Sequence, residues 1–118
     1  MRVLRLVGSV LLLVALVAAV TRTTSSAAST APDTHCTQAD LGAAFTAPLK
    51  LQSFQKFGCV DSWAFTWATI GTGQAQVGVT EVLQYLPIEQ SWMIVSRALD
   101  CKPDVLPKLV YREGCFSN

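Results

Sequence analysis

The chain has 118 residues, of which 51% are hydrophobic and 14% charged, with nine basic and eight acidic residues. This length suits one small domain. A formal net charge of +1 does not supply the strongly basic face that nucleic-acid-binding proteins usually carry. We therefore expect no nucleic-acid partner.

The amino-terminal segment has the organisation of a signal peptide. Two arginines precede an apolar run over residues 6–20. A membrane-spanning helix needs about 20 apolar residues, so this run is short for an anchor. We interpret residues 1–20 as the signal-peptide region and favour cleavage after Ala19. Cleavage after Ala28 and an uncleaved anchor are the alternatives.

Residues 21–33 are mostly Thr, Ser and Ala, a composition that cannot build a core and predicts a disordered leader. Residues 34–118 are then the secreted α+β domain. From residue 29 onward the chain has six basic and eight acidic residues, a formal charge of −2. An anionic membrane surface is therefore not an expected partner after signal cleavage.

Four cysteines lie in the predicted secreted domain, and an even number in an exported protein predicts disulfides. They are Cys36, Cys59, Cys101 and Cys115. Their spacing lacks the close pairs of structural zinc sites, so no metal is expected. Three pairings are open. We favour Cys36 with Cys59 and Cys101 with Cys115, because this pairing closes the shortest loops.

The first predicted element of the domain is a helix. Thr37 is a candidate N-cap, and apolar residues follow at helical spacing, which predicts a helix over residues 37–47. Pro48 ends it, because proline lacks the N–H that continues a helix. Residues 52–57 are interpreted as a connector or a short edge strand.

Three strands are predicted next, over residues 59–70, 77–86 and 92–98. A Gly-rich turn separates the first two, and residues 87–90 form the second turn. Short turns between consecutive strands imply an antiparallel meander.

A final short helix is predicted over residues 107–111, capped by Asp104 and with Pro107 in its first turn. The sequence therefore predicts a small disulfide-stapled α+β domain. It has a short N-terminal helix, a three-stranded antiparallel meander and a short C-terminal helix.

The first predicted strand has an aromatic face and a second face of smaller residues. Counting every second residue places on the aromatic face Cys59, Trp63, Phe65 and Trp67. The other face carries Val60, Ala64 and Ala68. We expect the aromatic face to pack on the N-terminal helix, against Leu41, Ala44 and Phe45. The alternative is a helix, because Trp63, Trp67 and Ile70 also fit helical spacing.

Aromatic side chains are the strongest candidates for binding, because Trp and Tyr combine a large apolar area with a polar group. The candidate ligand-binding residues are Trp63, Trp67, Tyr85 and Trp92. The alternative, which we favour, is that these side chains form the core of a small domain.

No pattern in the sequence predicts an enzyme. The single histidine, His35, is interpreted as a solvated turn residue, so a triad with Ser62 and Asp61 is not expected. Four acidic residues offer candidate carboxylate pairs for acid/base chemistry, but we interpret them as solvated surface. They are Glu81, Glu89, Asp100 and Asp104. We expect no catalytic residue and no cofactor.

The spacing Gly58-Cys59-x3-Trp63-Ala64, followed by Trp92, Cys101, Pro107 and Cys115, resembles a group of small secreted actinobacterial proteins of unknown function. The resemblance covers most of the chain after Cys36. Members often carry an Asp-Gly hairpin before the last tryptophan, where this chain has residues 87–90. The resemblance implies no activity, since the group has none assigned.

The expected function is that of a secreted, extracellular, non-enzymatic domain that acts by binding an extracellular protein or a cell-wall ligand. The first hypothesis is an inhibitor or modulator of an extracellular enzyme, since stapled folds present preorganised surfaces. The alternative is recognition of the cell wall or of carbohydrate through an aromatic surface.

Overall fold

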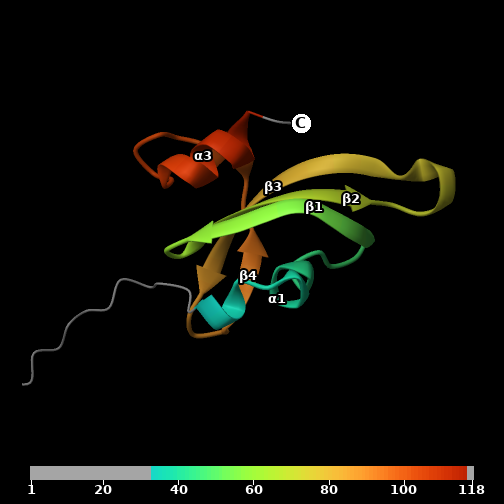
Figure 1. Cartoon of the computed structure of the whole chain (residues 1–118), viewed down its shortest axis with the longest axis horizontal. Coiled ribbons are helices and arrows are strands. Elements are labelled where there is room, and N and C mark those ends of the chain that lie inside the picture. Colours follow the sequence, from blue (N-terminus) through green and yellow to red (C-terminus); the bar gives the residue numbers. More distant parts are fainter. Residues whose placement is uncertain (1–32, 117–118) are drawn as a thin grey trace, which may run out of the picture.

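Four antiparallel strands form one sheet in the computed structural model, which describes residues 33–116 (Figure 1). They lie in the order in which they occur in the chain: β1 (Leu51–Val60), β2 (Trp63–Ile70), β3 (Val77–Leu86) and β4 (Ser91–Ile94). The antiparallel α+β class and the meander are confirmed. The prediction of three strands was wrong, because the sheet has four.

The additional strand is β1, which sequence patterning left as a connector. The predicted strand over residues 59–70 is in fact the end of β1, a two-residue turn and β2. Asp61 begins that turn with a φ of 53°, a conformation that Asp tolerates better than most residues. Since Val60 pairs with Trp63, Val60 shares the aromatic face, and Cys59 pairs with Ala64 on the other face. The predicted places of Val60 and Cys59 were therefore exchanged.

The N-terminal helix is shorter than predicted. A 3-10 turn, η1 (Asp33–His35), precedes α1 (Gln38–Gly42). The Thr37 hydroxyl accepts a hydrogen bond from the Asp40 amide at 3.1 Å, which confirms the predicted N-cap. The helix ends well before residue 47, because it reaches Gly42, a weak helix former, and tightens there into three-residue turns.

The boundaries of β3 and the turn at residues 87–90 are as predicted, and a short 3-10 turn, η2 (Gly73–Ala75), connects β2 to β3. The strand predicted over residues 92–98 ends at Ile94 and is followed by α2 (Arg97–Asp100). The last helix, α3 (Lys108–Cys115), extends beyond residue 111. Its N-cap is Pro107, so Asp104 does not cap it.

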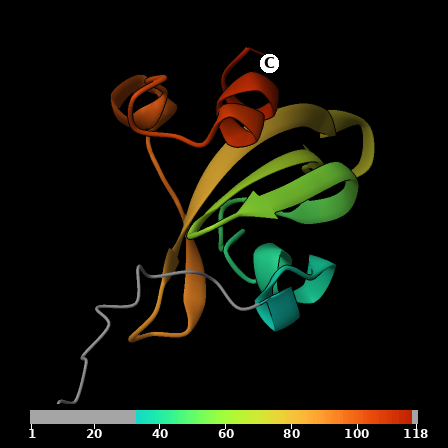
Figure 2. The same ribbon diagram turned by 60° about the vertical axis from the view of Figure 1, so that its left-hand side comes forward.

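The sheet lies between two helical layers, with α1 on one face and α3 on the other (Figures 1 and 2). The buried cluster on the α1 side is Leu41, Ala64, Leu83, Tyr85 and Trp92. The buried cluster on the α3 side is Phe65, Val82, Leu106 and Val110, with Trp63 and Trp67 packed against it.

The aromatic face of β2 therefore packs on α3, and its predicted packing on the N-terminal helix was wrong. The five-residue α1 buries only Leu41, which fits over the small side chain of Ala64. The longer α3 covers the bulky face because Gly114 allows close approach. A Cβ atom at that position would lie 2.7 Å from Cγ2 of Val82.

Both predicted disulfides are present, with S–S distances of 2.06 Å for Cys36–Cys59 and 2.14 Å for Cys101–Cys115. The first connects the segment before α1 to the end of β1. The second connects the segment after α2 to the end of α3. The first bond therefore ties the segment before α1 to the sheet, and the second ties the ends of α2 and α3 to each other.

The predicted signal peptide over residues 1–20 lies outside the described residues, as does the leader over residues 21–33 except for Asp33. Within residues 33–116, no helix is long and apolar enough to cross a membrane.

Candidate functional site

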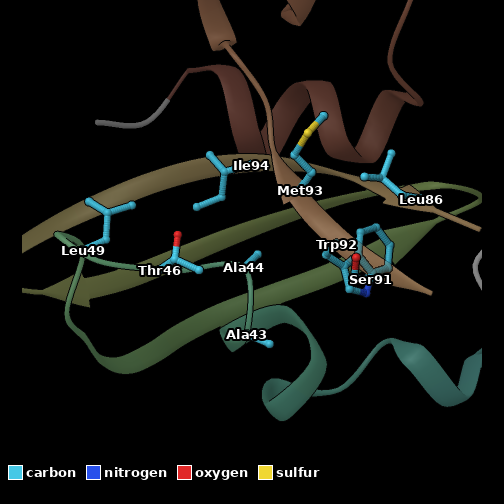
Figure 3. A pocket seen from close by; sticks show the side chains of 9 residues that line it. All are labelled: Ala43, Ala44, Thr46, Leu49, Leu86, Ser91, Trp92, Met93 and Ile94. Atoms are coloured by element: carbon cyan, nitrogen blue, oxygen red, sulfur yellow. The ribbon is translucent and has the colours of Figure 1, made fainter. Parts of the chain in front are cut away.

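A pocket of about 520 Å³ lies beside β4, at one edge of the sheet (Figure 3). One wall consists of Ser91, Trp92, Met93 and Ile94, which are all the residues of β4. Leu86 contributes from the end of β3. The remaining wall comes from the connection between α1 and β1, through Ala43, Ala44, Thr46 and Leu49.

Local structure explains why the connection between α1 and β1 reaches β4. The helix α1 contacts β4, and the chain must then return across the sheet to begin β1 at the opposite edge. Short turns hold the connection in shape, among them the hydrogen bond from the Leu49 amide to the Thr46 carbonyl at 2.9 Å. None of the lining residues is charged, so the pocket favours an uncharged, largely apolar group.

Trp92 is a fixed part of the pocket wall. Only 4% of the residue is exposed, and its Nε1 donates a hydrogen bond to the His35 carbonyl at 2.9 Å. The edge-on ring of Tyr85, with centroids 5.3 Å apart, supports the indole. The pocket is thus preformed on this side.

His35 is better fixed than the predicted solvated turn residue. It belongs to η1, and its ring lies 5.3 Å from that of Tyr85. Its Nδ1 is 3.5 Å from Oδ2 of Asp40. Ser62 and Asp61, considered with it as a triad, form the turn between β1 and β2, where the Ser62 carbonyl accepts a hydrogen bond from the Tyr85 amide.

Trp63 and Trp67 lie on the other side of the sheet. The Nε1 of Trp67 donates to the Glu113 carbonyl at 2.7 Å. Lys56 Nζ lies 4.9 Å from the Trp67 ring centroid and 3.2 Å from Oε1 of Glu113. Trp67 therefore anchors the end of α3.

The four aromatic candidates are not brought together as one surface. Trp92 lines the pocket and Tyr85 supports it, whereas Trp63 and Trp67 pack against the core under α3. Sequence reasoning missed the wall formed by Ala43, Thr46 and Leu49. These residues show no periodic pattern, and only the fold brings them next to β4.

The acidic candidates are dispersed, and Glu89 and Asp104 are exposed. In the part of the chain that the structure describes, no three His, Cys, Asp or Glu residues are grouped so that they could hold a metal ion. Burial raises the pKa of the Glu81 carboxyl group, and the positive charge of Arg97 partly offsets this effect.

We expect Glu81→Gln to raise the melting temperature at pH 7. An acid whose pKa is higher in the folded state than in the unfolded state destabilises the folded state when it is ionised. This destabilisation is absent below the unfolded pKa, grows as the pH rises from the unfolded to the folded pKa, and is complete above the folded pKa. The difference between the two proteins should therefore shrink below about pH 4 and vanish near about pH 3, where glutamate is protonated in both states. Thermal unfolding between pH 3 and pH 8 measures this. A lower melting temperature for Glu81→Gln at pH 7 would mean that attraction to Arg97 outweighs burial.

No family model matches the sequence, and comparisons with curated proteins and with solved structures give no match. The fold and the site therefore define the class of this protein: a small α+β domain with two disulfides and a preformed, uncharged pocket along one edge of its sheet.

Proposed function

We propose that this protein is a secreted, non-enzymatic domain that binds a protein outside the cell and acts as an inhibitor or modulator of an extracellular enzyme. The pocket beside β4 is the proposed binding site. The observation that carries this proposal is the preformed, uncharged wall around Trp92. Binding sites are usually concave, apolar and largely formed in advance, which lowers the entropic cost of association.

Export is supported by the two disulfides, because such bonds persist in oxidising compartments. We expect secreted protein to have lost its signal peptide, so mass spectrometry should find an N-terminus between Val20 and Ser29. Recovery of a chain that begins at Met1 from the membrane fraction would contradict this expectation.

The carbohydrate alternative gains no support from the positions of the tryptophans. A sugar-binding platform needs aromatic ring faces exposed together. Trp92 is almost fully buried and lies on the opposite face of the sheet from Trp63 and Trp67. Lys56 and Glu113 cover part of Trp67.

Filling the pocket tests the proposal. Ala43 lines the pocket but is exposed, so Ala43→Trp should block the pocket without opening a cavity in the core. Ile88→Trp is the matched control, because Ile88 is 92% exposed in the turn after β3. The assay is kcat/KM of purified extracellular proteases, glycosidases and esterases with saturating secreted protein.

We expect the wild type and Ile88→Trp to change the rate of at least one of these enzymes and Ala43→Trp to have lost the effect. An equal effect of all three proteins would place the binding surface elsewhere. No effect on any enzyme would contradict the proposed modulation.

A further inference from the structure

We infer that the pocket takes an extended polypeptide segment that adds to β4 as a fifth strand and inserts an uncharged apolar side chain. This inference rests on the proposed function, because it names the chemistry of the ligand for the same site. It is carried by the main chain of β4, the shape of the pocket and the contrast between the two sheet edges.

Among residues 33–116, the hydrogen-bond pattern leaves the outer main-chain groups of β4 without a partner. The Tyr85 amide donates to the Ser62 carbonyl on the β2 side of β3. The main-chain N–H and C=O groups of alternate residues of β3, including Gln84 and Val82, therefore point toward β4. The hydrogen bond from the Val95 amide to the Val82 carbonyl, at 2.9 Å, agrees with this, because it shows that the Val82 carbonyl points toward the β4 side. In this register Met93 pairs with Gln84. The N–H and C=O groups of Trp92 and Ile94 consequently point away from the sheet.

The pocket follows this edge. Successive side chains of a strand point to opposite faces of a sheet, yet all four residues of β4 line the pocket. A pocket above one face would be lined by the side chains of alternate residues only. This one therefore runs along the outer edge of the strand, where an added strand would lie. Residues of the added strand that lie opposite Trp92 or Ile94 would direct their side chains toward the pocket wall formed by Thr46 and Leu49.

The two edges of the sheet differ in how open they are. Along β1 the pairing shifts register twice, and Lys56 is an exposed charge on that strand. Bulges and lysines are devices by which edge strands avoid pairing with other chains. β4 has no charged residue, no proline and no register shift. Strand addition is therefore favoured at β4.

The chemistry of the lining selects the occupant. With no charged lining residue, the pocket would leave an acidic or basic side chain unpaired, so the inserted side chain is uncharged. A second copy fits less well, because four residues offer little area compared with about 1,600 Å² in a standard interface. The chain's own residues before Asp33 are the remaining competitor, since they join the domain beside Trp92 through η1.

The test uses short blocked peptides in which serine alternates with Val, Leu, Phe or Met between terminal lysines. Each peptide is compared with an analogue that is N-methylated at its three central residues, which keeps the side chains but removes the main-chain donors. Binding to the ¹⁵N-labelled secreted protein is followed by NMR. The protein variants are Ala43→Trp, which fills the pocket, and Ile94→Pro, which removes an outward N–H. Ile88→Trp is the control.

We expect at least one parent peptide to shift the amide signals of residues 91–94. Its methylated analogue should bind about tenfold more weakly, because the one or two N–H donors that would face β4 are lost. Ala43→Trp and Ile94→Pro should weaken binding, whereas Ile88→Trp should not. Equal binding of parent and analogue would overturn strand addition while leaving the pocket as a binding site. Shifts away from β4, or no binding by any peptide, would also overturn it.

Two further outcomes would assign the edge to another occupant. A concentration-dependent shift of residues 91–94 without peptide would assign it to a second copy. Binding that requires deletion of the residues before Asp33 would assign it to the chain itself. If no enzyme responds to the protein but a peptide still binds, and binds more weakly when it is N-methylated, the modulator proposal is contradicted. The inference of strand addition would then still stand.

Discussion

Replacing Phe65 with alanine is expected to lower the free energy of unfolding by about 3–5 kcal/mol, the usual cost of truncating a buried aromatic residue. Phe65 is only 2% exposed and lies in the cluster between the sheet and α3. Its ring also lies directly over β1, since a Cβ atom at Gly58 would come within 2.7 Å of it. Neighbouring elements cannot collapse fully into the space because the Cys101–Cys115 disulfide, which packs against this cluster, limits their movement.

Chemical denaturation followed by tryptophan fluorescence measures this effect. Ile88→Ala is the control, because Ile88 is exposed in the turn at residues 87–90 and should change stability by less than about 0.5 kcal/mol. A loss below about 1 kcal/mol for Phe65→Ala would show that the cluster under α3 is not the tightly packed core described above.

Removal of the Cys36–Cys59 disulfide has the second largest expected effect. The double substitution Cys36→Ala and Cys59→Ala should cost about 3 kcal/mol, because the bond closes a long loop and restricts the unfolded chain. It should also loosen η1, whose His35 carbonyl holds the indole of Trp92. We therefore expect lower stability together with a more accessible Trp92.

Thermal unfolding gives the stability of this variant, and acrylamide quenching in a Trp63→Phe, Trp67→Phe background reports on Trp92 alone. The Cys101→Ala, Cys115→Ala pair is the matched control. It should lose a similar stability without a direct effect on Trp92, since its bond lies in the layer of α3. Equal quenching in both variants under native conditions would contradict the role assigned to the first disulfide.

The sequence was sufficient for the features that depend on local chemistry. Alternation and turn residues located β3 and the turn at residues 87–90, and the Thr37 hydroxyl marked the start of α1. Loop length was enough to favour the correct disulfide pairing. The aromatic residues of β2 were correctly placed on one face.

The errors concern features that are decided by tertiary contacts. β1 is an edge strand rich in Gln, Ser and Lys, so its polarity resembles that of a connector. The turn at Asp61 contains neither Gly nor Pro, so two strands appeared as one. Periodicity shows that an aromatic face exists but not which helix covers it.

The candidate site was predicted only at Trp92, with Tyr85 behind it. The pocket depends on the connection from α1 passing beside β4, and no local pattern in residues 43–49 signals that path. The outward direction of the Trp92 and Ile94 main-chain groups depends on how β2, β3 and β4 are paired, because each pairing decides which residues point their N–H and C=O groups to which side. A single sequence does not contain that information in local form.

Amide hydrogen exchange within β4 tests the central claim, an open binding edge at this strand, most directly. Met93 donates toward β3, so its amide should exchange slowly. The amides of Trp92 and Ile94 should exchange rapidly in the free protein and become protected when a strand-forming peptide binds. Protection of Trp92 and Ile94 equal to that of Met93 in the free protein would show that the edge is already covered, and would contradict an open binding site at β4.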